Sequence, residues 1–197
     1  RGVIPLLKDH PALNSFCMTN EPVYQTNHSD LYTPYYQEFL KNKYGDINSL
    51  NTVYNTQYSG FDQIGMPQQI VESVWYYDWK VFNESVNKEW HEWMAGIIRE
   101  IAPNVPIHSK VIPLASFEDD AETRSYMSHG MNYDNFINVS DLLGTDGGNV
   151  IMEEEGYLGE YMGYDLITSL KDAPLYNSEH HMIKDGSNVY SDEMAKH

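Results

Sequence analysis

The stretch "LNSFCMTNEP", residues 13–22, decides the fold. The apolar run 13–19 ends in Asn20-Glu21-Pro22, which predicts a short buried strand with a carboxylate at its C-terminal end. A carboxylate in that position is costly unless it is paired, hydrogen-bonded or chemically useful. Glu21 is therefore the first candidate functional residue.

Helical patterns follow the first strand. Residues 32–44 are predicted to form a helix with Thr33 as N-cap, Pro34 at the first helical position and Gly45 beyond the end. Residues 71–101 carry an apolar stripe with helical spacing that stops at Pro103. Residues between these helices, 50–69, have no clean period and are predicted to form a long loop.

Three more apolar runs predict strands, at residues 105–112, 136–143 and 174–178, and a further helix is expected at residues 159–170. Alternation of strands and helices is typical of parallel βα units. In such folds the functional groups gather at the C-terminal ends of the strands. The sequence therefore predicts an α/β protein whose site lies at that edge of the sheet.

Polar residues lie at or near the ends of several predicted strands. Glu179 follows the fourth strand and Asp146 follows the third. Around the end of the second strand the candidates are His108, Ser109 and Lys110. Two carboxylates across one cleft are what glycoside hydrolysis needs, one to protonate the leaving oxygen and one to attack or to activate water. In a chain with 29 acidic residues a strand-end glutamate is also commonly a capping or salt-bridged surface group, so the pair alone does not decide the function.

The net charge and the cysteine count exclude several classes of binding partner and site. A formal net charge of −17 repels phosphate backbones and anionic lipid heads, so we expect neither nucleic acid nor a membrane surface as a partner. A single cysteine, Cys17, leaves no internal disulfide and no cysteine-rich zinc site. We expect a carbohydrate as the substrate, and neither a cofactor nor a metal ion. The sequence does not decide between a monomer and a homo-oligomer.

The motifs "MTNEP" (residues 18–22) and "LYNSEHH" (residues 175–181) resemble the fourth-strand and seventh-strand motifs of the clan A retaining glycoside hydrolases. The segment "DHPAL", the segment "YYQEFLKNKYGDINSLNTVYNTQY" and the helix "DWKVFNESVNKEWHEWMAGIIREIAPNVPI" are similar to glycoside hydrolase family 42, the β-galactosidase family. The resemblance covers roughly residues 9–185. It implies part of a (β/α)8 TIM barrel, strands 4 to 7 with their helices.

By this resemblance Glu21 is the acid/base and Glu179 the nucleophile of a retaining enzyme that cleaves β-linked glycosides, with β-galactosides favoured. Substrate-binding roles are expected for Asn20, His108, Lys110, Asp146 and His181. Adjacent residues of a strand point to opposite sides, so at most one of His180 and His181 shares the cleft. The stretch "GTDGGN", residues 144–149, departs from the Trp-Asp-Asn-Tyr stretch usual at the family's sixth strand and retains only Asp146.

That departure leaves two alternatives open, namely another clan A glycosidase such as a β-agarase-like endo-enzyme on galactan polymers, or a catalytically silent carbohydrate-binding barrel. Two intact glutamates speak against the silent barrel. A whole barrel takes about 250 residues, so residues 1–197 are expected to be a fragment of one catalytic domain whose remainder lies outside this sequence. A complementing or domain-swapped second chain is the other explanation.

Overall fold

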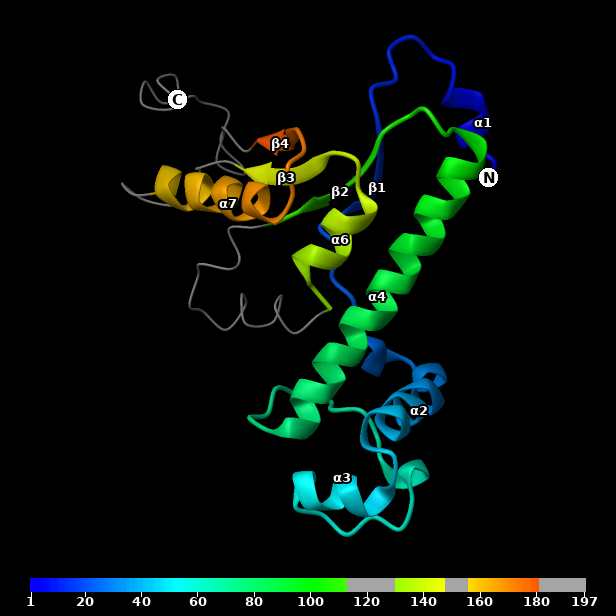
Figure 1. Cartoon of the computed structure of the whole chain (residues 1–197), viewed down its shortest axis with the longest axis vertical. Coiled ribbons are helices and arrows are strands. Elements are labelled where there is room, and N and C mark those ends of the chain that lie inside the picture. Colours follow the sequence, from blue (N-terminus) through cyan, green and yellow to red (C-terminus); the bar gives the residue numbers. More distant parts are fainter. Residues whose placement is uncertain (113–129, 148–155, 181–197) are drawn as a thin grey trace. The chain divides into compact units, whose positions relative to one another are not determined.

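The computed structural model describes residues 1–112, 130–147 and 156–180. It contains a four-stranded parallel sheet in the order β1-β2-β3-β4 (Figure 1). The strands are β1 Phe16–Asn20, β2 Ile107–Val111, β3 Leu143–Gly147 and β4 Leu175–His180. All three strand pairs are parallel and follow chain order, which confirms the predicted α/β class.

Helices occupy most of the connections between the strands. The α-helices are α1 Ile4–Leu7, α2 Thr33–Tyr44, α3 Ile47–Tyr54, α4 Val74–Ile101, α6 Tyr133–Val139 and α7 Gly156–Leu170. Three single-turn 3-10 helices are η1 Thr26–His28, η2 Asp30–Tyr32 and η3 Phe61–Gln63. The 28-residue α4 confirms the long amphipathic helix predicted from residues 71–101.

The chain divides into two compact units. Among the described residues, the sheet unit comprises residues 1–22, 90–112, 132–147 and 156–180, and the helical unit comprises residues 23–89 and 130–131. The helix α4 contributes its last twelve residues to the sheet unit and the rest to the helical unit.

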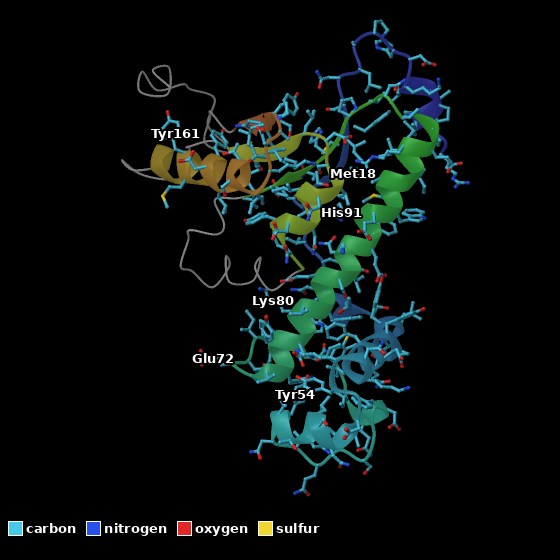
Figure 2. The ribbon with its side chains drawn as sticks, in the orientation of Figure 1. Met18, Tyr54, Glu72, Lys80, His91 and Tyr161 are labelled. Carbon is cyan, nitrogen blue, oxygen red and sulfur yellow. The ribbon has the colours of Figure 1, made fainter. Side chains whose placement is uncertain are left out.

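One face of the sheet is packed on helices. Ile107 of β2 is fully buried in a cluster with Ala95 and Ile98 of α4 and Val139 of α6. On β1, Met18 packs on the same cluster, and Figure 2 labels it beside α4. Successive side chains of a strand point to opposite faces. His108 and Lys110 of β2 therefore lie on the other face.

The helical unit has its own core. Tyr36 and Leu40 of α2, Leu50 of α3 and Trp79 of α4 are among its buried residues. Asp78 is fully buried within it and accepts hydrogen bonds from Lys43 and from the hydroxyls of Tyr44 and Tyr54. Three donors on one carboxylate satisfy a charge that would otherwise be costly to bury.

Residues 136–143 do not form the strand that the sequence predicted. Residues 133–139 form α6 instead, and the strand begins only at Leu143. Phe136, Ile137 and Val139 are buried on the helix. The apolar run was too short to separate a buried helix from a buried strand by periodicity. Since β3 is Leu143–Gly147, Asp146 lies within the strand and not in a loop after it.

Two further expectations were wrong in detail. Residues 50–69 are not one long loop, because α3 covers residues up to Tyr54 and η3 follows. Asp46 caps α3 by accepting hydrogen bonds from the backbone N–H groups of Asn48 and Ser49. This N-cap could have indicated the helix although the apolar residues show no helical period. At the start of α2 the N-cap is Tyr32, and Thr33 already lies inside the helix, while Gly45 ends it with a φ of +79° as expected.

In the described residues, no helix combines the length and the apolar character that crossing a membrane requires.

Gly144 is required by the close approach of β2 and β3. A Cβ atom at this position would lie 2.4 Å from the backbone oxygen of Ser109 and 2.5 Å from Cδ2 of His108. We expect Gly144→Ala to lower the free energy of unfolding by about 1–3 kcal/mol, because overpacking shifts the backbone. Urea denaturation followed by circular dichroism measures the change.

The matched control is Gly96→Ala in the exposed part of α4, where an added Cβ meets no atom within 4 Å. Alanine at an exposed helix position is better than glycine by about 1 kcal/mol, so this variant should be slightly more stable. If Gly144→Ala is as stable as the parent protein, the contact between the two strands is looser than described.

Candidate active site

Irregularities in two strands aim the candidate carboxylates. On β4, Asn177 pairs with Thr145 and Glu179 pairs with Asp146, so Ser178 is an extra residue. Without this bulge Ser178 would lie beside Asp146, and Glu179 would point to the helix-packed face. The bulge therefore brings Glu179 to the face that carries Lys110 and Asp146.

A similar irregularity precedes Glu21. On β1, Cys17 pairs with His108 and Asn20 pairs with Lys110, so three steps on β1 match two on β2. Glu21 then adopts a φ of +47°, which residues other than glycine rarely do. Its backbone N–H donates a hydrogen bond to the carbonyl oxygen of Lys110. A conformation of this kind costs about 1–3 kcal/mol and persists where the surrounding structure imposes it, often at functional sites.

The side-chain amine of Lys110 lies at the centre of the resulting cluster. Its Nζ atom is 3.3 Å from Oε1 of Glu21 and 3.1 Å from Oδ2 of Asp146, and it also donates to Oε2 of Glu179. One oxygen from each of the three carboxylates lies within 4.8 Å of the other two. The cluster therefore joins all four strands of the sheet, with one charged side chain from each.

Exposure divides the four side chains into two pairs. The Lys110 side chain is 2% exposed and that of Asp146 is 10% exposed. The side chains of Glu21 and Glu179 are 32% and 43% exposed. The two glutamates are thus accessible to a ligand, whereas lysine and aspartate form the floor beneath them.

The environment favours a proton on Glu21. A hydrogen bond with Asp146 and partial burial raise the pKa of Glu21 above its ordinary value, and these effects exceed the opposing influence of Lys110. Two carboxyl groups can share a hydrogen bond only when one of them carries a proton. Burial alone would lower the pKa of Lys110, but its hydrogen bonds to Glu179, Asp146 and Glu21 raise it, so the amine stays charged at neutral pH.

His108 lies two residues before Lys110 on the same face of β2. It is 2% exposed, and within the described part of the chain neither ring nitrogen has a hydrogen-bond partner. Tyr176 of β4 contacts the ring edge-to-face, with centroids 5.6 Å apart. Burial lowers the pKa of His108, so the ring is neutral at neutral pH and offers one donor and one acceptor.

Of the residues singled out from the sequence, Glu21, Lys110, Asp146 and Glu179 come together in one cluster. Asn20 is the neighbour of Lys110 in the strand register, and its side chain is exposed. Ser109 lies on the helix-packed side of β2, buried and away from the cluster. His181 lies outside the described residues.

Sequence reasoning missed two features of the site. The contact of the Lys110 amine with three carboxylates was not expected from the sequence, and the predicted binding of substrate by Lys110 stays a prediction. Tyr176 was one of sixteen tyrosines with no distinguishing signal, because in a regular strand a residue three positions before Glu179 points to the opposite face. Three carboxylate oxygens this close can also hold a metal ion, but Lys110 already supplies the positive charge at that place.

The parallel sheet and its strand-end carboxylates define a class of protein, the α/β barrels that gather their functional groups at the carboxyl ends of the strands. Within that class, residues 3–183 match the family model Glyco_hydro_42, described as beta-galactosidase. The chain belongs to this family. No curated protein matches the sequence.

Several solved structures share the fold. They include a beta-galactosidase from Rahnella sp. R3 (17% identity, TM-score 0.75) and the apo exo-carrageenase of Bacteroides ovatus (22%, 0.71). Gan42B, a beta-galactosidase of G. stearothermophilus, is 24% identical with a TM-score of 0.72. The matches cover 96%, 90% and 96% of this chain but only 28%, 27% and 29% of those chains. The chain thus corresponds to part of a (β/α)8 barrel and spans under a third of each relative's length.

Replacing Asp146 by Asn should lower the pKa of Glu21. The hydrogen bond to the Asp146 carboxyl group favours the protonated form of Glu21, whereas an amide can donate to the ionised form. Carbon-13 NMR of glutamate-labelled protein, titrated with pH, measures the change directly.

The control is Asp172→Asn, an exposed aspartate between α7 and β4. It should leave the titration of Glu21 unaltered. A Glu21 that titrates identically in the parent protein and in Asp146→Asn would show that Asp146 does not stabilise its proton.

Proposed function

We propose that the protein is a retaining glycoside hydrolase that cleaves β-linked glycosides, with Glu21 as acid/base and Glu179 as nucleophile. The observation that carries the proposal is the closeness of the two accessible glutamates, whose oxygens lie within 4.8 Å. In retaining enzymes the two carboxyl groups are about 5–5.5 Å apart, whereas inverting enzymes need about 6.5–9.5 Å to admit a water molecule. Membership of the family supports the same reaction.

The two environments support different roles for the two glutamates. Glu21 has a raised pKa and hydrogen-bonds with Asp146, which suits a group that must hold a proton until the leaving oxygen takes it. Glu179 accepts from the charged amine of Lys110, which suits a carboxylate that must stay ionised to attack the anomeric carbon. In the second step Glu21 would take a proton from the water that releases the sugar.

Other residues are proposed to hold the sugar. Asn20 presents an exposed amide beside the cluster, and the buried ring of His108 has two unpartnered nitrogens in the described part of the chain. Asp146 is proposed as a further acceptor for a sugar hydroxyl. His181 keeps its proposed role from the sequence alone.

The substrate is proposed to be a β-galactoside. Two of the three compared structures are named beta-galactosidases, and the third is named an exo-carrageenase. A substrate panel should therefore contain aryl β-galactosides, aryl β-glucosides, agarose oligosaccharides and carrageenan oligosaccharides. It is to be applied to the protein in which this sequence occurs, at its natural length.

Replacing Glu179 by Ala should abolish turnover of every substrate, because no covalent intermediate can form. Replacing Glu21 by Ala should spare the first step for aryl glycosides with good leaving groups, and the covalent intermediate should then accumulate. Added azide should attack that intermediate and release a β-glycosyl azide from the Glu21 variant. With the Glu179 variant, azide should attack the substrate directly and yield the α-glycosyl azide.

Proton NMR identifies both azides and the first-formed sugar. Exchange of the two azide anomers between the variants would reverse the roles of Glu21 and Glu179. A first-formed α-anomer from a β-glycoside would overturn the retaining mechanism. If the parent protein binds these sugars but hydrolyses none of them, it is a carbohydrate-binding barrel and not an enzyme.

A further inference from the structure

Lys110 is more deeply buried than any other charged side chain of the cluster, and the reaction proposed above gives it no step. Its side chain is 2% exposed, and its amine contacts all three carboxylates. The three N–H donors of the amine are matched by three carboxylate oxygens, so none is left for a sugar. Lys110 is instead well placed to act on Glu21 and Glu179, the two glutamates that are accessible to a sugar.

The charges of the cluster require a cation at this place. Two unit charges 4 Å apart interact by about 1 kcal/mol in water and by about 4 kcal/mol at an effective dielectric constant of 20. Three ionised carboxylates within 4.8 Å of one another would therefore take up protons at neutral pH if no positive charge compensated them. Protonation of Glu179 would remove the nucleophile.

Lys110 donates to all three carboxylates, and Glu21 differs from Glu179 in a second contact. The amine favours the ionised forms of Glu179, Asp146 and Glu21. At Glu21 the hydrogen bond with Asp146 and partial burial oppose the lysine and favour the protonated form. The proton of the cluster therefore belongs with Glu21 and Asp146, and the lysine contact is left to keep Glu179 ionised.

Resting on the function proposed above, we propose that Lys110 is a positioning residue that keeps Glu179 ionised and fixes its carboxylate, leaving the proton of the cluster to Glu21 and Asp146. Lys110 takes no part in bond making and does not contact the sugar. It replaces a bound cation with one that is covalently part of β2, so its place is fixed by the strand register with Asn20 and Gly144.

The test compares Lys110→Met, Lys110→Arg and a control, Lys8→Met, in the full natural protein. Lys8 belongs to the same sheet unit, and its partner is the exposed Asp9. Profiles of kcat/KM against pH are measured with an aryl glycoside that the parent protein hydrolyses. Active-site titration with a 2-fluoro glycoside that traps the covalent intermediate counts competent molecules and corrects for misfolded protein.

For Lys110→Met we expect the acidic limb of the profile to move to higher pH by about one unit or more, because an opposite charge at this distance lowers the pKa of a carboxyl group by about one to three units and the variant removes that charge. Lys110→Arg should keep the acidic limb near its original pH, because arginine retains the positive charge. It should lower kcat, because the larger planar guanidinium group does not fit the position of the lysine amine. Lys8→Met should leave both unchanged. A limb that stays in place in Lys110→Met, with KM raised and kcat unaltered, would overturn the proposal and make Lys110 a sugar ligand.

A second readout does not need turnover. Carbon-13 NMR of labelled glutamate, with Glu179 assigned through Glu179→Gln, follows its ionisation in the parent protein and in Lys110→Met. Ionisation of Glu179 at higher pH in the variant supports the proposal, and an unchanged titration overturns it. Absence of hydrolysis in the parent protein would instead overturn the proposed function and leave this titration as the deciding measurement for Lys110.

Discussion

The interaction on which the site depends is the contact of one buried ammonium group with three carboxylates, each from a different strand. Lys110 belongs to β2 and contacts all three carboxylates. Glu21 directly follows β1, Asp146 lies in β3 and Glu179 lies in β4. The parallel order of the strands places their carboxyl ends at one edge, which is why residues separated by more than a hundred positions can meet. Neither the acidic groups nor the lysine could be buried alone at acceptable cost.

Regular strands would not have produced this cluster. The extra residue in β4 reverses the face on which Glu179 lies, and the positive φ of Glu21 turns a side chain that would otherwise follow Asn20 onto the opposite face. Gly144, which has no Cβ, leaves room for the His108 ring and for the backbone oxygen of Ser109. The two irregularities, at Ser178 and at Glu21, have the same effect, because each one moves a carboxylate toward the same face of the sheet.

The sequence predicted the parts of this arrangement that follow from pattern. Helical periodicity located α4, and the apolar runs ending in Glu21 and Glu179 located two strands with their carboxylates. It did not locate β3, because the stretch 143–147 is rich in glycine and the apolar residues before it belong to α6. It also could not assign Lys110, because the role of a lysine in a buried strand depends on which side chains neighbouring strands bring to it. Register shifts of a single residue decide that, and no periodicity records them.

The charge of the cluster bears on the transition state that the proposed reaction must stabilise. Three carboxylates, one ammonium group and one proton on the Glu21–Asp146 pair leave a net charge of −1 on the four side chains. In glycoside hydrolysis the sugar ring acquires positive charge as the leaving group departs. Without Lys110 the carboxylates would retain more protons, and without the shared proton the leaving oxygen would have no acid. With Lys110 buried beside them, the two accessible glutamates provide one acid and one nucleophile. The cluster as a whole keeps one negative charge near the positive charge that develops on the sugar ring. This charge balance provides electrostatic stabilisation of the transition state.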